Sequence, residues 1–112
     1  VGNKYLKYGF GFGGPCLPRD NKALAIYAGE IGLNPLISIA SDKSNSQHLQ
    51  HQIAYFIQNN SKNKPVYIYG VTYKTNTEII EESQQFEFAL ALVKSGYKVI
   101  IEESENVINE IK

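Results

Sequence analysis

Apolar residues at helical spacing mark the first half of the chain. Asp20 or Asn21 can cap a helix that runs to about Ile31, and Gly32 can end it. The apolar side chains of this segment fall on one helical face and comprise Ala23, Leu24, Ile26, Tyr27 and Ile31. The pattern therefore predicts an amphipathic helix.

A second and longer helix is predicted from Asn34 to Asn59. Asn34 supplies an N-cap, and Pro35 is a proline suited to a first helical turn. About 24 residues at about 1.5 Å each would extend about 36 Å, which exceeds the width of a domain of this size. The ends of the segment are apolar, but Leu49 is the sole large apolar residue over 41–52. We therefore expect this helix to support a second subunit or a neighbouring domain.

The second half of the chain follows a strand, helix, strand order. Residues 66–71 form a β-branched and aromatic run, and 99–101 form a second short apolar run. Between them, an apolar helical face predicts a helix over 82–95, and 105–112 can form one more short helix. This order is typical of a βαβ unit with a parallel sheet. The predicted fold is an α/β fragment, a helical central region followed by a partial βαβ unit, because two strands alone make an incomplete sheet.

The composition is that of an ordinary globular protein. The 112 residues carry 11 basic and 11 acidic side chains, so the balance gives no electrostatic case for nucleic acid or an anionic membrane. No apolar run approaches the roughly 20 residues that span a bilayer, and no signal segment opens the chain, so we expect a cytoplasmic protein. One cysteine excludes an internal disulfide. The chain begins at Val1 and lacks methionine, and we expect it to be a fragment.

Residues 1–18 are dense in glycine and aromatic residues, which predicts a loop. Within it, 9–14 (GFGFGG) formally matches the dinucleotide fingerprint G-x-G-x-x-G. That fingerprint needs a strand before it and a helix directly after it. Only eight residues precede the match, and Pro15 and Pro18 follow it closely. We therefore reject a dinucleotide-binding interpretation of this loop.

Cys16 follows the glycines and is the first candidate for chemistry. A thiolate is a strong nucleophile, and a helix N-terminus stabilises negative charge. Gly13 and Gly14 would let a substrate carbon approach the sulfur, and Asp20 could orient or deprotonate a water molecule. Alternatively, Cys16 simply packs, because free cysteines are among the most buried residues. These features alone leave both interpretations open.

Two longer segments carry a family resemblance. Tyr5-Leu6-Lys7, together with GFGGPCLPRD over 11–20, resembles the catalytic segment of the UDP-glucose/GDP-mannose dehydrogenase family. The run YGVTYK over 69–74, followed by Thr77 and Glu82-Ser83, resembles the start of that family's C-terminal nucleotide-sugar domain.

The resemblance extends from about residue 5 to residue 103. It divides the chain into a catalytic glycine-rich loop (1–18), a helical dimerisation region (19–60) and a partial C-terminal nucleotide-sugar-binding domain (65–112). It also implies that the family's N-terminal NAD-binding domain and the rest of its C-terminal sheet lie outside these residues.

The resemblance implies an NAD-dependent nucleotide-sugar 6-dehydrogenase that acts as a homodimer through its central helices. Members oxidise a sugar's primary alcohol to a carboxylate, and Cys16 matches the cysteine that forms a thiohemiacetal and then a thioester. Asp20 matches an aspartate that assists water in proton transfer. The positions that match substrate-binding residues are Tyr5, Leu6, Lys7, Gly9, Phe12, Gly13 and Lys74.

Two positions depart from the family pattern. Arg19 stands where lysine is commoner, which keeps the charge. Glu81 stands where a cofactor-contacting arginine is expected, and a carboxylate repels a diphosphate. Glu81 favours an alternative function, a catalytically impaired relative or a scaffold that acts as a dimerisation module. A stand-alone thiol enzyme is a third possibility, but it lacks a convincing base near Cys16 in sequence.

Two further clusters have simpler explanations. His48 and His51 lie three residues apart on the long predicted helix, and a solvated helix face explains them better than a metal site. Glu102, Glu103 and Glu105 follow a predicted strand and fit a strand-end loop. The sequence predicts no metal site.

Overall fold

The computed structural model describes residues 9–112, so the predictions for Tyr5, Leu6 and Lys7 lie outside the described residues. The elements, in chain order, are α1 (Leu17–Glu30), α2 (Leu36–Asn59), β1 (Val66–Tyr69), α3 (Gln84–Lys94), β2 (Val99–Glu102) and α4 (Glu105–Ile111). Each element expected from the hydrophobic pattern is present. The prediction of a mixed α/β fragment is therefore confirmed.

Helix α1 begins earlier than the sequence pattern predicted. Cys16 is its N-cap residue, and Pro18 lies in its first turn, where a missing N–H leaves no intrahelical bond unmade. The prediction that Asp20 or Asn21 caps this helix was therefore wrong. The error came from treating the prolines as barriers to a helix start, although a first-turn proline favours one.

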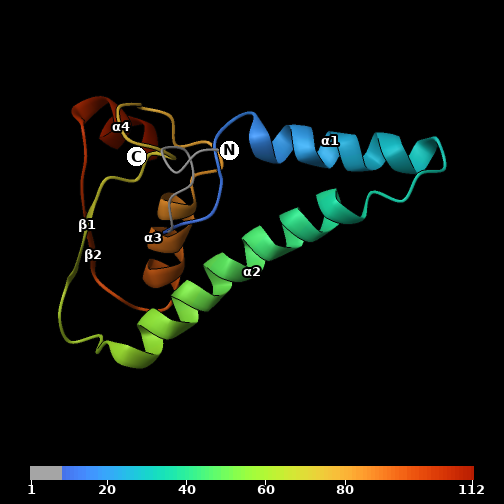
Figure 1. Ribbon diagram of the computed structural model, residues 1–112. Coiled ribbons are helices and arrows are strands. Elements are labelled where there is room, and N and C mark those ends of the chain that lie inside the picture. Colours follow the sequence, from blue (N-terminus) through green and yellow to red (C-terminus); the bar gives the residue numbers. More distant parts are fainter. Residues whose placement is uncertain (1–8) are drawn as a thin grey trace.

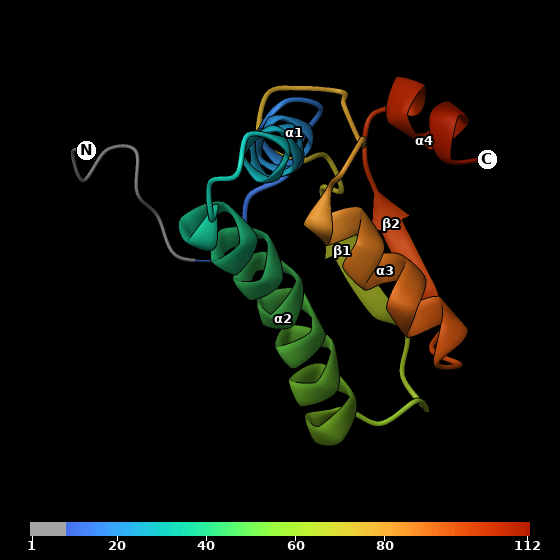
Figure 2. The same ribbon diagram turned by 90° about the vertical axis from the view of Figure 1, so that its right-hand side faces the viewer.

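Strands β1 and β2 form a two-stranded parallel sheet with Val66 opposite Val99 and Tyr69 opposite Glu102. Helix α3 connects the two strands and lies across one face of the sheet (Figure 2). Side chains alternate along β1, so Val66 and Ile68 are half-buried while Tyr67 and Tyr69 are exposed. The sheet therefore has one covered face and one aromatic face that no described element covers.

The buried apolar residues gather in the second half of the chain. Val71, Ala89, Leu92, Tyr97 and Val107 are at most 4% exposed. Helix α2 contributes no fully buried residue, and α1 contributes only Pro18 and Ala28. The core therefore belongs to the α/β unit, which we define as residues 66–112.

Helices α1 and α2 form a hairpin, called here the helical arm (residues 17–59). Figure 1 shows α1 projecting away from the sheet, with α2 running back toward the lower end of the α/β unit. The radius of gyration is 16.2 Å, whereas a compact chain of this length would have about 13 Å. The chain exposes 8346 Å² of surface, against about 6200 Å² for a compact protein of its mass. The arm therefore leaves much of its surface without a covering partner among the described residues.

The arm's exposed surface is apolar. Its large exposed side chains are Leu17, Leu24, Ile26, Tyr27, Ile31, Leu33, Leu36, Ile37, Ile39 and Tyr55. The face predicted for the first helix is thus present, but it does not pack inside this chain. None of the helices within residues 9–112 combines the length and the apolar character needed to cross a membrane.

Candidate functional site around Cys16

The loop that leads into Cys16 is held by side chains from two distant parts of the chain. From α2, the amide of Asn45 donates to the carbonyl of Phe12 at 2.8 Å, and His48 Nε2 lies 2.6 Å from the carbonyl of Gly9. From the first residue of α3, Gln84 Oε1 accepts a hydrogen bond from Gly11 N at 2.7 Å. The loop therefore has a defined backbone path although it contains neither helix nor strand.

Close packing explains two of the loop's glycines. A Cβ at Gly13 would collide with the carbonyl oxygen of Glu82, and a Cβ at Gly14 would lie 2.6 Å from the ring of Tyr73. Gly14 also has a φ of +91°, which disfavours any other residue. The sequence suggested that these glycines keep space open for a substrate. The structure gives a second reason for both glycines, because Glu82 and Tyr73 fill the space that a Cβ would occupy.

Cys16 is exposed, at the N-cap of α1. The first backbone N–H groups of a helix have no intrahelical partners and favour negative charge beside them. Because the side chain is exposed, Cys16 does not pack into the core that the described residues form. A nucleophile needs this kind of access and electrostatic support.

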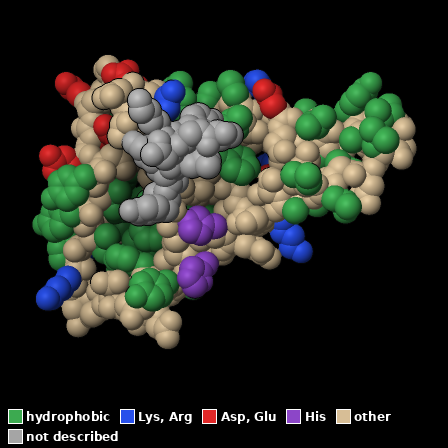
Figure 3. All heavy atoms as spheres, viewed as in Figure 1, with side chains coloured by type: hydrophobic (Ala, Val, Ile, Leu, Met, Phe, Trp, Pro, Cys, Tyr) green, Lys and Arg blue, Asp and Glu red, His purple; other side chains and the backbone are tan. Residues whose placement is uncertain are grey.

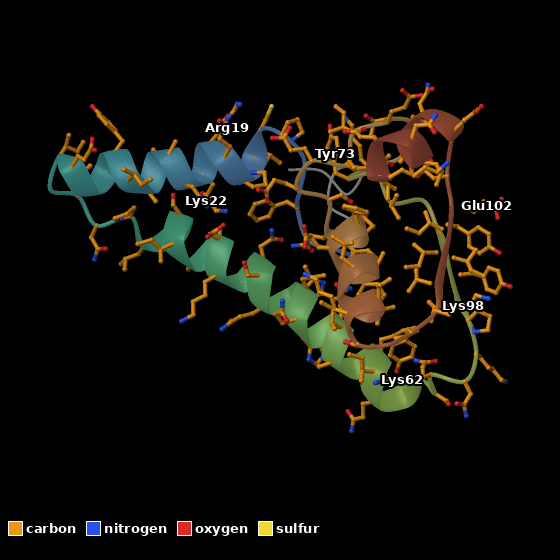
Figure 4. All side chains as sticks on the ribbon, turned by 180° about the vertical axis from the view of Figure 1, so that it is seen from behind. Arg19, Lys22, Lys62, Tyr73, Lys98 and Glu102 are labelled. Atoms are coloured by element: carbon orange, nitrogen blue, oxygen red, sulfur yellow. The ribbon has the colours of Figure 1, made fainter. Side chains whose placement is uncertain are left out.

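Arg19 interacts with two carboxylates, those of Asp20 and Glu81. Its Nε donates to Asp20 Oδ1 at 3.0 Å, and both side chains are about two-thirds exposed. This hydrogen bond, with the charges of Asp20, Cys16 and Glu81, raises the pKa of Arg19. Figure 4 shows Arg19 pointing outward from the first turn of α1. The arginine thus places a permanent positive charge near both the thiol and Glu81.

Lys74 lies in a separate region at the carboxyl end of β1. It lines a groove of about 960 Å³ that also contains Phe10, Tyr69, Thr72 and Glu103. Cys16 is not among the residues lining this groove, so the structure does not bring Lys74 and Cys16 into one cavity. The groove combines aromatic walls, one ammonium group and several hydroxyls, which suits a ligand with an anionic and a planar part.

Tyr73 connects these two regions and was missed by the sequence analysis. One part of its ring lies against Gly14, and the Lys74 ammonium lies 5.4 Å from the ring centroid. Figure 4 shows Tyr73 near the junction of the loop with the α/β unit. In the sequence, the position of Tyr73 beside Lys74 was the one available signal. The contact between Tyr73 and Gly14 could not be predicted, because the two residues lie 59 positions apart.

The two histidines do not form a metal centre. Within residues 9–112, no three His, Cys, Asp or Glu side chains gather closely enough to hold a metal ion. Figure 3 shows both histidines at the surface. His51 stacks on Tyr55, whereas His48 contacts the Gly9 carbonyl, so the expected solvated face also carries a loop contact.

The acidic cluster near the second strand has a structural role. Glu103 Oε2 accepts a hydrogen bond from Val71 N at 2.9 Å, and Oε1 accepts one from Ser104 N at 3.0 Å. Glu102 ends β2 and Glu105 begins α4. The sequence placed all three glutamates in a loop at the end of a strand. Glu103 does lie in this loop, whereas Glu102 belongs to β2 and Glu105 belongs to α4.

Comparison with known proteins identifies the class. Residues 1–47 match the model of the UDP-glucose/GDP-mannose dehydrogenase family, central domain. GDP-mannose 6-dehydrogenase from Azotobacter vinelandii is 35% identical over 101 residues, 89% of this chain and 22% of that protein. UDP-glucose 6-dehydrogenase from Rickettsia conorii is 34% identical over 97 residues, 84% of this chain and 22% of that protein.

The fold agrees with the sequence matches. A crystal structure of a ternary complex of GDP-mannose dehydrogenase from Pseudomonas aeruginosa superposes with a TM-score of 0.85 and 28% identity, covering 97% of this chain and 24% of that one. The chain belongs to the UDP-glucose/GDP-mannose dehydrogenase family and spans about 22% of the length of its curated relatives. The resemblance noted in the sequence is therefore confirmed.

Proposed function

We propose that this chain is part of an NAD-dependent nucleotide-sugar 6-dehydrogenase in which Cys16 is the covalent nucleophile. The observation that carries the proposal is the exposed thiol at the N-cap of α1, within reach of the positive charge of Arg19. Relatives named GDP-mannose and UDP-glucose 6-dehydrogenase support the substrate class.

In the proposed chemistry, the Cys16 sulfur acts first as the nucleophile and later as the leaving group. Cys16 Sγ adds to the carbon of a sugar aldehyde, and the aldehyde oxygen takes up a proton to give a thiohemiacetal. Loss of a hydride from that carbon, with loss of the hydroxyl proton, leaves a thioester. Water then cleaves the carbon–sulfur bond, which releases the carboxylate and regenerates the thiol. Asp20, four residues from Cys16, is the proposed group that assists this water.

Lys74 and the loop are the proposed substrate contacts. The groove at the end of β1 offers Lys74 as a partner for a phosphate, with Phe10 and Tyr69 as aromatic walls. Gly9, Phe12 and Gly13 belong to the loop that would enclose the sugar. For Lys74 and Cys16 to act on one substrate, the nucleotide sugar must extend between the groove and the thiol.

NAD is the proposed hydride acceptor, but the described residues do not fit its binding. They contain two strands rather than a full dinucleotide-binding sheet. In addition, the position where the family pattern has a cofactor-contacting arginine holds the exposed carboxylate of Glu81. The cofactor would therefore be bound by residues outside this set, and we assign none of residues 9–112 to it.

The helical arm is the proposed dimerisation surface. Its exposed apolar side chains, among them Leu24, Ile26 and Leu36, would be buried by a second copy of the chain. Sedimentation velocity measures this directly: we expect dimers at tens of micromolar, and a shift toward monomer in Ile26→Lys. Strictly monomeric wild-type chain would oppose this part of the proposal.

Cys16→Ser in the complete gene product tests the proposed chemistry. A serine hydroxyl is a much poorer nucleophile than a thiolate at neutral pH, so carboxylate production should fall by several orders of magnitude. Exposed Ser46 on α2 provides the control, because Ser46→Ala should leave the rate unchanged. Undiminished carboxylate production by Cys16→Ser would refute the assignment.

A second candidate function is a scaffold that retains the fold without turnover. Glu81 favours it, because a carboxylate at the position where the family pattern has a cofactor-contacting arginine repels a diphosphate. Glu81→Arg in the complete gene product discriminates between the candidates. If Glu81→Arg binds NAD or the nucleotide sugar more tightly than the wild type in isothermal titration, the protein is an impaired enzyme. If neither the wild type nor Glu81→Arg binds either molecule, the scaffold is supported.

A further inference from the structure

Gln84 connects three segments that are far apart in the sequence. Its side-chain oxygen accepts from Gly11 N at 2.7 Å, and its side-chain nitrogen donates to the carbonyl of Asn45 at 3.1 Å. Asn45 in turn donates to the carbonyl of Phe12 at 2.8 Å. The two amides therefore hold the two-residue segment Gly11–Phe12 at both of its ends, and we call this arrangement the amide clasp (Asn45 and Gln84).

The clasp is built into the interior of the molecule. Gln84 is 6% exposed although its side chain is polar. Both polar ends of its amide have partners, as a buried amide requires. Gly11 fits the clasp because a Cβ there would collide with the side-chain oxygen of Asn45 and with the Gln84 amide. Any larger residue at position 11 would therefore open it.

The clasp is anchored to the core of the α/β unit. Ser83, the residue before Gln84, is 1% exposed and caps α3, accepting from Phe86 N at 3.2 Å. The Ser83 hydroxyl also donates to the carbonyl of Val71 at 2.6 Å. The start of α3 is thus fixed to the end of β1 on one side, and Gln84 extends from it to the loop on the other.

The clasp also changes which loop groups are free to bind a substrate. The N–H of Gly11 and the carbonyls of Gly9 and Phe12 already have side-chain partners within the chain. A substrate would have to displace Gln84 in order to use the single N–H of Gly11. The Gly9 carbonyl already has two side-chain partners, His48 and Gln52. These hydrogen bonds therefore fix the path of the loop, which reaches Cys16 five residues after Gly11.

We infer that Asn45 and Gln84 are positioning residues, which set the location of the Cys16 thiol by holding the N–H of Gly11 and the carbonyl of Phe12 between α2 and α3. This inference rests on the proposed function of Cys16. According to this inference, Gln84 at the start of α3 affects catalysis although it does not contact the reacting atoms. Loss of the clasp should misplace the thiol and slow the chemical step, while Lys74 and Tyr69, which line the groove outside the clasped loop, still bind the nucleotide sugar.

Hydrogen exchange of the Gly11 amide, followed by NMR on the 112-residue chain, tests the clasp itself. In Gln84→Ala the exchange should be at least about tenfold faster, because its acceptor is gone. Gln84→Glu keeps an acceptor for Gly11 and should remain within about threefold of wild type. Gln47→Ala, an exposed glutamine on α2, is the control and should not differ from wild type. Unchanged Gly11 exchange in Gln84→Ala, or equal acceleration in Gln84→Glu, would overturn the inference.

Steady-state kinetics of the complete gene product test the role in positioning. Gln84→Ala and Asn45→Ala should each lower kcat by about tenfold or more, with KM for the nucleotide sugar within about twofold. Combining them should add little, because they act as one unit. A raised KM with unchanged kcat would overturn the inference. If the wild type makes no carboxylate, the proposed function fails, and the exchange measurement still decides whether the clasp holds the loop.

Discussion

The α/β unit and the helical arm contain similar apolar residues but bury them to different extents. Leu92 of the α/β unit is fully buried, whereas Leu24 of the arm is 57% exposed. The α/β unit packs α3 against β2 and closes a small core, which also buries Val107 of α4. The arm's two helices contact each other along only part of their length and present apolar side chains outward (Figure 1).

This difference shows that stability and function are distributed unequally along the chain. The α/β unit supplies the folding free energy, because buried apolar area is the main favourable term. The arm supplies the start of α1, where the candidate nucleophile lies, and a large exposed apolar surface. The loop over 9–15 depends on both regions, since α2 and the start of α3 each hold it.

Truncating a core leucine should have the largest effect. Leu92→Ala removes a fully buried side chain, and we expect a loss of about 3 kcal/mol in the free energy of unfolding. Leu24→Ala in the arm makes the same change at an exposed position and should cost less than about 1 kcal/mol. Urea denaturation followed by circular dichroism measures both. Equal losses at the two positions would contradict the contrast drawn above.

Two glycines give the next largest contrast. Gly14→Ala adds a Cβ against the Tyr73 ring at a φ of +91°, and should destabilise the chain by about 1–3 kcal/mol. Gly29→Ala, in the arm's α1, meets nothing within 4 Å and should stabilise it by about 0.5–1 kcal/mol. Thermal denaturation should therefore shift Tm in opposite directions. A shift of the same sign in both variants would show that the loop is not packed as described.

The sequence pattern predicted the elements well because helices and strands depend on local periodicity. The long helix over 34–59 and the two strands agree with α2, β1 and β2 to within two residues. The start of α1 was predicted four or five residues too late, with the cap at Asp20 or Asn21 instead of Cys16. Its signal is a first-turn proline at Pro18, which reads as a helix breaker unless Cys16 is known to be the N-cap.

The candidate site was only partly predictable. Cys16 was found from its surroundings in sequence, and its exposure agrees with a nucleophile. The roles of Gln84 and Tyr73 could not be found, because the hydrogen bond from Gly11 to Gln84 joins residues 73 positions apart. No local pattern encodes such a pairing, and it arises only when the α/β unit packs against α2.

A smaller effect is expected where the arm joins the α/β unit. The hydroxyl of Tyr97 donates to the carbonyl of Asn60 at 2.6 Å, just after α2 ends. Tyr97→Phe should cost about 1 kcal/mol of unfolding free energy, because the ring stays buried while one hydrogen bond is lost. Tyr55→Phe, exposed on α2, should have no measurable effect. Chemical denaturation distinguishes them, and equal effects would argue against a role for this contact.

The smallest effect on stability should come from the exposed ion pair at the start of α1. Arg19→Gln removes the bond to Asp20, but exposed pairs contribute little, so we expect no resolvable change in Tm. The pair raises the pKa of Arg19, so any contribution to stability is fully present below the ordinary pKa of arginine. At high pH it is lost only as the arginine deprotonates. A clear loss of stability between pH 6 and pH 8 that disappears in Arg19→Gln would contradict this.

The most direct test of the central claim is the mass of the peptide that contains Cys16. The complete gene product would be mixed with its nucleotide sugar and NAD, quenched with acid at successive times, and digested. The account predicts a population of this peptide that carries the sugar acyl group on Cys16 and disappears as carboxylate accumulates. Carboxylate that accumulates while Cys16 stays unmodified at every time point would contradict the account.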